Sequence, residues 1–322
     1  MTNRQLNVAN TYDGANIMKK HSALAGLALA LVAGSAFAAD LPSRKAPIIV
    51  EPPPPVFTWT GLYGGINIGY GFGNGDRDPG SLFYSPYKYA IDGVPFSVNP
   101  AGSAWSIGND LNGVLGGGQV GYNYQFNPWL VVGVEADIQA TDIHSQGNGI
   151  GGAVDGLGPH TSYATQNKSV DWFGTVRGRV GVTFPSIPNL LVYGTGGLAY
   201  GGVVHSFNVS DVYSSFLGGG SLAVLGAGTN YDQTKVGWTA GGGVEWFPLI
   251  SNPLFKAFSV KLEYLYTDLG STTLYGSSIG SIPTGGPAFF YQQTSHTRWN
   301  TVRVGVNWHF NPFAAAPVLA KY

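Results

Sequence analysis

The stretch TVRVGVNWHF, Thr301–Phe310, alternates strictly between apolar and polar side chains. Every second residue from Val302 onward is apolar, whereas Arg303, Asn307 and His309 are among the residues between them. Successive side chains of a β-strand point to opposite faces, so this pattern predicts a strand with one apolar and one polar face. In a soluble domain the polar face would meet water. In an outer-membrane barrel the apolar face would meet lipid and the arginine would lie inside.

Similar alternation recurs along the chain and gives about eight candidate strands, each near the 9 to 11 residues that cross a bilayer when tilted. The segments are 58–72, 113–126, 129–139, 170–184, 190–202, 235–247, 258–268 and 301–310. Short connections alternate with long ones, which is the usual layout of outer-membrane barrels. The long connections, expected to be four outer loops, lie around residues 73–110, 140–168, 204–233 and 269–297.

Composition supports the membrane interpretation. Only 10% of the 322 residues are charged, whereas 13% are aromatic and 49 are glycine. A globular domain is roughly one quarter charged, so a soluble protein of this size would be poorly covered. The net charge of -1 gives no reason to expect nucleic acid as a partner. The absence of cysteine excludes disulfides and thiolate metal sites.

The N-terminal region predicts export. Residues 18–38 combine two lysines, a short apolar run and an Ala-Phe-Ala end, as in a secretory signal peptide cleaved near Ala38/Ala39. Residues 1–17 fit poorly in front of it, and Met18 is an alternative start. Residues 39–57 are rich in proline and predict a periplasmic linker. The barrel is expected over 58–310, followed by a short tail over 311–322.

Charged residues share the polar parity of their strands. A charge facing lipid at mid-bilayer costs about 2 to 4 kcal/mol for Arg or Lys, so these side chains are expected to point inward. An eight-stranded barrel is just wide enough for its side chains to fill it, which favours paired charges and a packed interior over a wet ion path. The predicted interior charge network comprises Glu135, Asp137, Arg177, Arg179, Glu245, Lys261, Glu263 and Arg303.

Aromatic residues gather at the strand ends and predict two girdles at the membrane interfaces, separated by an apolar band. At the short-turn end they are Trp59, Phe126, Trp129, Phe184, Trp246, Phe258 and Phe310. Towards the long connections they are Phe72, Trp172, Trp238, Tyr266 and Trp299. The fold expected is therefore all-β, an eight-stranded antiparallel transmembrane β-barrel.

The chain resembles the alpha-proteobacterial outer-membrane β-barrel family of the outer membrane immunogenic protein type, with an OmpA-like eight-stranded barrel. The stretches that carry the resemblance are ADLPSRKAP, WTGLYGGINIGYGFG, GVEADIQ, DWFGTVRGRVG, VYGTGGLAYG, GWTAGGGVEW, VKLEYLYTDLG and VRVGVNWHF. The resemblance implies that an aromatic residue at the end of the last strand is read by the barrel-assembly machinery. Phe310 and Tyr322 are both candidates.

Catalytic and metal chemistry find little support in the sequence. The pairs His144-Ser145, His205-Ser206 and Ser295-His296 lie in or beside the long connections. Neighbours in sequence seldom form a catalytic dyad, because catalysis needs a nucleophile and base within hydrogen-bond reach. The histidines are spread over different connections without metal-motif spacing and are expected to be solvated. We therefore expect no enzyme, no catalytic residue, no cofactor and no metal.

The function expected is that of an integral structural or surface protein of the outer membrane, with a closed or nearly closed barrel. Two alternatives are a small-solute pore, and the binding of haem or host molecules through the outer connections. The aromatic, weakly charged segments 81–96 and 285–293 suit recognition or packing on the membrane interface. Expected partners are outer-membrane lipid, lipopolysaccharide and the barrel-assembly machinery, with a possible extracellular ligand.

Overall fold

The structure is a computed structural model that describes residues 56–84, 87–91, 94–98, 101–155, 158–214, 221–248, 255–279, 288–310 and 312–314. The expected signal peptide, the upstream extension and nearly all of the linker and tail lie outside these residues. Among the described residues there is no helix long and apolar enough to cross a membrane.

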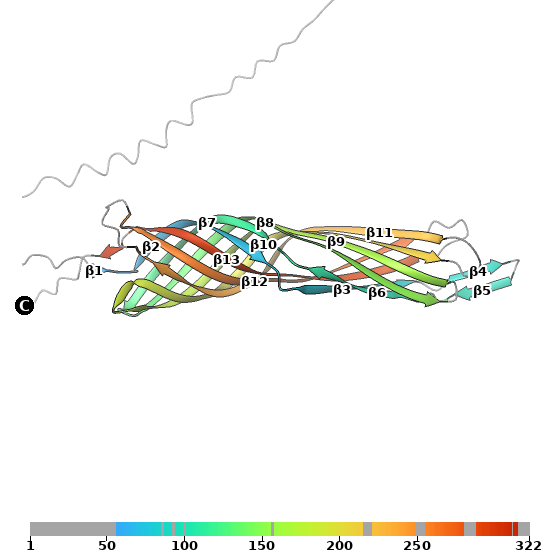
Figure 1. Cartoon of the computed structure of the whole chain (residues 1–322), viewed down its shortest axis with the longest axis horizontal. Helices are drawn as coiled ribbons and strands as arrows, with labels where there is room; N and C mark the ends of the chain where they lie inside the picture. Colours follow the sequence, from blue (N-terminus) through green and yellow to red (C-terminus); the bar gives the residue numbers. More distant parts are fainter. Residues whose placement is uncertain are drawn as a thin grey trace, which may run out of the picture. The chain divides into compact units, whose positions relative to one another are not determined.

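Strands make up almost all of the described chain (Figure 1). They are β1 (Val56–Phe57), β2 (Gly61–Phe72), β3 (Asp76–Tyr84), β4 (Tyr87–Ile91), β5 (Val94–Val98), β6 (Ser103–Asn109), β7 (Gly113–Asn127), β8 (Leu130–Asp155), β9 (Gly158–Phe184), β10 (Ile187–Ser214), β11 (Ser221–Trp246), β12 (Phe258–Ile279), β13 (Ala288–His309) and β14 (Phe313–Ala314).

Eight of these strands form a closed antiparallel ring, in the order β2-β7-β8-β9-β10-β11-β12-β13 and back to β2. Each of the eight contains one of the alternating segments in the sequence, so the predicted eight-stranded barrel is confirmed. We call this part the transmembrane half. Short turns between β7 and β8 and between β9 and β10 lie at one end, where β1 also pairs with β14.

Long strands continue beyond the ring and form a second part, which we call the extension: residues 76–109, 142–171, 203–235 and 269–298 within the described ranges. β8, β9 and β10 run through both parts, with lengths of 26, 27 and 28 residues. The expectation that these segments are long loops is wrong. They were expected to be loops because they connect the alternating segments, but they form long hairpins whose inner side chains pack on one another.

The extension consists of two four-stranded sheets, β8-β9-β10-β11 and β12-β13-β3-β6. In the described residues, no backbone pairing joins β11 to β12 beyond Trp238 and Asp268. The facing sheets enclose an apolar core, as in a β-sandwich. Its buried residues include Leu82, Trp105, Phe207, Leu225, Leu274, Phe289 and Tyr291.

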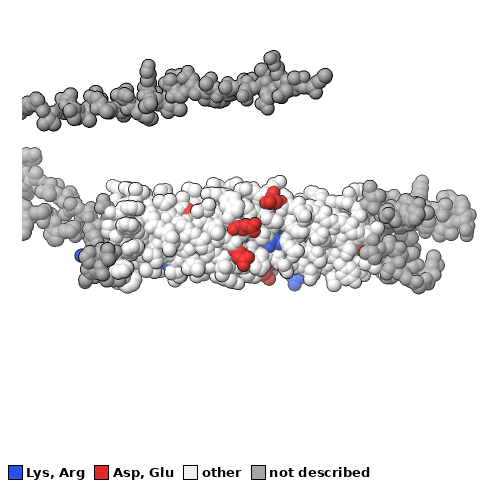
Figure 2. Space-filling view, turned by 90° about the horizontal axis from the view of Figure 1, so that it is seen from above, with Lys and Arg blue, Asp and Glu red and all other residues white. Residues whose placement is uncertain are grey.

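Register shifts mark the boundary between the two parts. They occur at Ala140/Ile143 on β8, Gly202/Val203 on β10 and Asp268/Ser271 on β12. Exposed acidic residues gather at this level, and Figure 2 shows acidic residues, with some basic ones beside them, midway along a face that carries little other charge. Asp110, Asp142 and Asp171 are among them. We call this band of charge, which also includes the exposed Arg77, the acidic belt; it marks the outer limit of the lipid-facing surface, because charge is costly in hydrocarbon.

Below the acidic belt, the outer surface of the transmembrane half is apolar. On β13 and directly after it, Val302, Val304, Val306, Trp308 and Phe310 are all exposed, so the apolar face of the stretch 301–310 is the outer face of the barrel. On the ring strands in this half, every described Arg, Lys and Glu points inward instead.

Two residues of the predicted girdles do not face lipid. Trp59 and Trp299 are each 0% exposed and lie in buried apolar clusters inside the barrel. Their position near strand ends suggested the interface, but strand alternation puts Trp59 on the same side as Tyr63, and Trp299 on the same side as Arg303, both of which are buried.

The remaining girdle residues lie on the outer surface. The exposed ones are Phe72, Phe126, Trp129, Trp172, Phe184, Trp238, Trp246 and Phe310. Phe258 and Tyr266 are partly buried.

Candidate functional site: the lumen of the barrel

The centre of the transmembrane lumen holds the interior charge network. All eight predicted members are buried: Glu135, Asp137, Arg177, Arg179, Glu245, Lys261, Glu263 and Arg303. They come from β8, β9, β11, β12 and β13, whose alternation turns them towards the barrel axis. Four acids and four bases therefore meet in a space screened from water.

Arg177 and Arg303 connect the acidic groups of β8 and β12. The guanidinium of Arg177 lies 2.9 Å from Asp137 and 3.1 Å from Glu263. Arg303 lies 2.9 Å from Asp137 and 2.6 Å from Glu263. Each carboxylate thus contacts two guanidinium groups, a geometry that offsets the cost of burying charge. Thr175 adds a hydrogen bond to Asp137, at 2.8 Å.

A second cluster lies nearer the turn end, around Glu245. Arg179 reaches this carboxylate at 2.8 Å, and Ser259 donates a hydrogen bond to it at 2.6 Å. Asn307 donates at 2.9 Å, and His309 Nε2 lies 3.0 Å away. Glu245 is therefore held by side chains from β9, β12 and β13, which ties the strands together.

Tyrosines complete the network and were missed in the sequence interpretation. Tyr63 donates to Glu135 at 2.7 Å and accepts from Arg179 at 2.8 Å. Tyr193 donates to Glu263 at 2.9 Å, and the guanidinium of Arg179 lies 3.9 Å from its ring centroid. The signal that could have found them is their inward parity, which they share with the charges.

Apolar layers close the lumen on both sides of the network. Towards the turns, Trp59, Val131, Leu191 and Phe247 form one layer, with the Trp59 and Phe247 rings 5.1 Å apart. The Trp59 indole donates to the Pro188 carbonyl at 2.9 Å, which fixes this ring in place.

At the level of the acidic belt lies a second layer, in which the Phe173 and Trp299 rings are 5.3 Å apart. Its buried members also include Leu111, Leu115, Ile143, Val170, Val203 and Leu269. Apart from Leu111, which lies between β6 and β7, they come from β7, β8, β9, β10 and β12, so an ion that moved along the axis would meet hydrocarbon at two levels.

Above the second layer, the extension contains a small buried polar layer. Asp78 lies 3.6 Å from the ammonium of Lys168 and accepts hydrogen bonds from Gln166 and Ser295. Burial raises the pKa of Asp78, but Lys168 and these hydrogen bonds outweigh it and hold the pKa below its usual value. Burial lowers the pKa of Lys168 to about 8, although Asp78 opposes this shift.

The histidines are placed differently from the expectation of solvated loop residues. His160 and His205 point into the extension and are buried, whereas His144 and His296 lie on its outer side. This follows from strand alternation, because the connections are strands. Among the described residues, no group of three or more His, Asp or Glu side chains could hold a metal ion.

A closed ring of antiparallel strands with an apolar outer band and an inward charge network defines an outer-membrane β-barrel protein. The chain matches the family model described as outer membrane protein beta-barrel domain over residues 25–310, and it belongs to this family.

Named relatives agree with this assignment. The chain is 34% identical over 281 residues to a 31 kDa outer-membrane immunogenic protein of Brucella melitensis, with 87% of this chain and 96% of the relative covered. It is 32% identical over 207 residues to a 22 kDa outer membrane protein of Rhizobium leguminosarum, covering 62% of this chain and 75% of that protein. The resemblance to this type of protein is thereby confirmed, and these relatives place the chain among outer-membrane proteins.

Solved structures give a more distant likeness. The attachment invasion locus protein Ail of Yersinia pestis is 13% identical, with a TM-score of 0.24, and 76% of this chain and 99% of that chain are covered. The outer membrane protease OmpT of Escherichia coli is 13% identical, with a TM-score of 0.32, and 79% of this chain and 98% of that chain are covered.

Proposed function

We propose that this outer-membrane protein is closed to solutes and serves as a structural envelope protein that displays a rigid β-sheet extension at the cell surface. The observation that carries the proposal is the filled lumen, in which an ionic network lies between two apolar layers. A pore needs a continuous polar path, and the layers around Trp59 and Trp299 interrupt it. The small-solute alternative is therefore disfavoured.

Single-channel conductance in a planar bilayer tests this proposal. The purified protein, shown to be folded by its heat-dependent shift on a gel, is expected to leave the membrane electrically silent. A porin reconstituted in the same lipid supplies the positive control. Reproducible current steps whose size or ion selectivity changes in Arg177→Gln or Glu263→Gln would contradict a closed lumen.

We also propose that the protein is not an enzyme. The three Ser-His neighbours noted in the sequence are split by strand alternation: Ser145, His205 and Ser295 point inward, and their neighbours point outward. The buried cluster at the tip of the extension is arranged differently, with Asp211 at its centre. Asp211 contacts His160 at 2.9 Å and accepts a hydrogen bond from Ser162. A triad needs the histidine between serine and acid, so this geometry supports a structural role.

We further propose how the chain is exported and assembled into the outer membrane. The signal peptide is cleaved near Ala38/Ala39, which the N-terminal sequence of the purified protein would test. Phe310 is the residue read by the barrel-assembly machinery, because it is 63% exposed and its ring stacks 5.6 Å from that of Trp308 at the end of the lipid-facing row. Lipid and lipopolysaccharide surround the apolar band. Phe310→Ala is expected to reduce the folded protein recovered from outer membranes, and Tyr322→Ala is not.

A further inference from the structure

The outer face of the β8-β9-β10-β11 sheet in the extension carries side chains of an unusual kind for exposed strands. Backbone pairing places Gln146, Asn167, Ser206 and Asn230 in one row across the four strands. The next row holds Asn148, Thr165, Asn208 and Gly228. We call these two rows the amide face. None of these side chains is charged, and all but Ser206 are well exposed to solvent.

Strand propensity does not explain this choice of residues. Asparagine and glycine are depleted in strands because they add little packing to a pleated surface. Yet four asparagines and a glycine occupy the centres of four neighbouring strands here. Among the described residues, the five amide side chains of the amide face make no hydrogen bond to the protein. A surface that departs from local preference without a structural gain is a candidate for binding.

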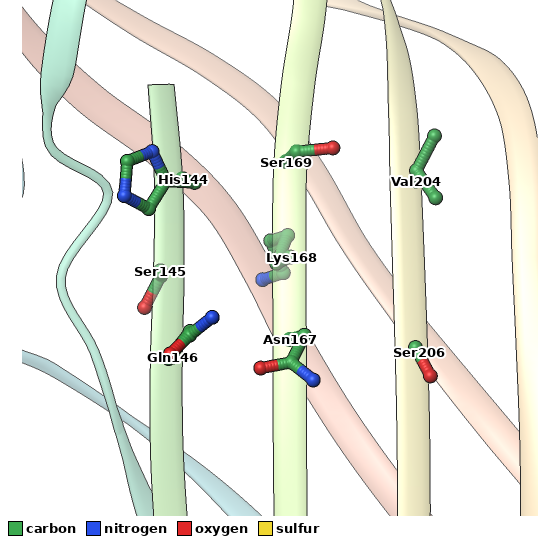
Figure 3. A pocket seen from close by; sticks show the side chains of 8 residues that line it. All are labelled: His144, Ser145, Gln146, Asn167, Lys168, Ser169, Val204 and Ser206. Carbon is green, nitrogen blue, oxygen red and sulfur yellow. The ribbon is translucent and has the colours of Figure 1, made fainter. Parts of the chain in front are cut away.

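The amide face is also hollowed. One hollow, of about 470 Å³, lies along β9, β10 and β11 and is lined by Tyr163, Thr165, Asn208 and Gly228. A second, of about 220 Å³, follows on the same face towards the acidic belt, where Asn167 lies between Gln146 and Ser206 (Figure 3). A Cβ atom at position 228 would lie 2.4 Å from Asn208 Oδ1, so glycine leaves room for the amide to lie across β11.

Tyr163 stands at the upper end of the amide face. Its side chain is 47% exposed, next to Ser210 on β10 and Ile150 on β8. An exposed aromatic ring offers an apolar platform, and the neighbouring amides and hydroxyls offer both donors and acceptors. Such a combination suits a flat ligand that has C–H faces and many hydroxyl groups.

We propose that the amide face binds a neutral saccharide, with one sugar ring packed on Tyr163 and the following units hydrogen-bonded to Asn208, Thr165 and Asn167. The acidic belt at the base of the face, with Asp142, Asp171 and Asp232, disfavours sulfated or phosphorylated sugars by charge repulsion. Lys168 forms part of the wall of the hollow of about 220 Å³, but its ammonium group lies inside the extension, 3.6 Å from Asp78. The face as a whole therefore matches an uncharged ligand.

Saccharide of this kind has two sources, the lipopolysaccharide around the barrel and glycans in the surroundings of the cell. Binding to the folded, full-length protein in detergent would be measured by calorimetry with two probes. One is a set of soluble neutral oligosaccharides of glucose, galactose and mannose. The other is the saccharide released from the lipopolysaccharide of the membrane that yields the protein, with its phosphates removed.

Tyr163→Ala and the double variant Asn167→Ala/Asn208→Ala are expected to weaken binding about tenfold or more, as expected when a few neutral contacts are lost. Tyr275→Ala removes a tyrosine that is 68% exposed on β12, in the opposite sheet of the extension, and Gln292→Ala removes an amide on β13. These matched controls are expected to bind like the unchanged protein. The heat-dependent gel shift confirms that each variant is folded.

If the soluble probe binds, and only the amide-face variants weaken its binding, the ligand is an external glycan. If only the membrane-derived probe binds in this way, the ligand is lipopolysaccharide. Both results support the proposal. The proposal is overturned if neither probe binds, if the control variants lose as much affinity, or if sulfated versions of the sugars bind more tightly than the neutral ones.

Discussion

The Nζ of Lys261 lies 2.8 Å from Oε1 of Glu135, although the two residues stand on opposite sides of the barrel. Between β8 and β12 the ring contains β9, β10 and β11 on one side and β7, β2 and β13 on the other. This ion pair therefore spans the lumen, and both side chains are almost fully buried. A barrel in which two side chains meet across the axis has no room for a wide channel at that level.

Lys261→Met is expected to destabilise the barrel by about 1–3 kcal/mol, because Glu135 loses one buried partner but keeps Arg177, 2.5 Å away. Unfolding by urea in lipid vesicles, followed by tryptophan fluorescence, would measure the change. Lys256→Met is the matched control, since Lys256 is exposed beside β12 and its loss should change stability by less than about 0.5 kcal/mol.

A double variant, Lys261→Met/Glu135→Gln, separates pairing from packing. Removing both charges is expected to cost less than the sum of the two single variants, because the residues are in contact. Strict additivity of the two losses would show that the cross-lumen pair contributes nothing.

The position of the membrane can be tested on the outer surface. Val304 faces outward on β13 and is exposed below the acidic belt, whereas Thr234 is exposed on β11 in the extension. Val304→Arg should therefore cost about 2–4 kcal/mol and reduce assembly into outer membranes. Thr234→Arg should have little effect, because its side chain meets water. Folded protein recovered from outer membranes would be the measure, and similar losses in both variants would show that the acidic belt is not the lipid boundary.

The alternation of apolar and polar residues was the most informative feature of the sequence for predicting the fold. It predicted the eight strands of the ring and the inward position of residues such as Arg177 and Glu263, because one face of each strand must suit lipid. The same rule, applied to Trp59 and Trp299, would have placed both inside. Their nearness to strand ends suggested a girdle, and parity was the better guide.

The local sequence pattern did not predict how far the strands continue into the extension. In segments such as 142–155 and 203–214, the outer face meets water and the inner face is small or mixed, so Ser145, Gly149 and His205 gave no clear apolar stripe. The sandwich core depends on distant partners, such as Trp105 against Phe207, whose rings are 6.2 Å apart. Contacts between residues so far apart in sequence leave no local signal, which is why the extension was interpreted as loops.

The buried Trp299 provides a further prediction. Trp299→Ala removes a large side chain from the apolar layer at the level of the acidic belt and should cost about 3–5 kcal/mol, because the surrounding strands cannot collapse fully into the space. Trp308→Ala is the comparison, since that indole is exposed on the lipid side of β13 and creates no cavity when removed. Urea unfolding in vesicles would rank the two variants. A larger loss of stability for Trp308→Ala than for Trp299→Ala would contradict the buried position of Trp299.

His205 predicts a pH dependence in the extension. It is buried on β10 and faces Lys168 on β9, Asp78 on β3 and Lys235 on β11. Burial is the main influence and, together with the two lysines, lowers the pKa of His205 to about 4, while Asp78 opposes the shift. In the unfolded chain the imidazole takes up a proton near pH 6.5, whereas in the folded chain it stays neutral until about pH 4. Stability contributed by neutral His205 is therefore complete above pH 6.5 and is lost as the pH falls towards 4, by up to about 3 kcal/mol.

The imidazole signals of His205 in the folded protein, followed by NMR between pH 3 and 8, would test this expectation directly. The signals that disappear in His205→Gln are those of His205. The same variant should not lose stability between pH 6.5 and 4. Asp78 becomes protonated only at a lower pH than His205, because the pKa of Asp78 is held below 3.8. An imidazole that titrates at 6.5 or above would mean that water reaches His205, and that the polar layer of the extension is open rather than sealed.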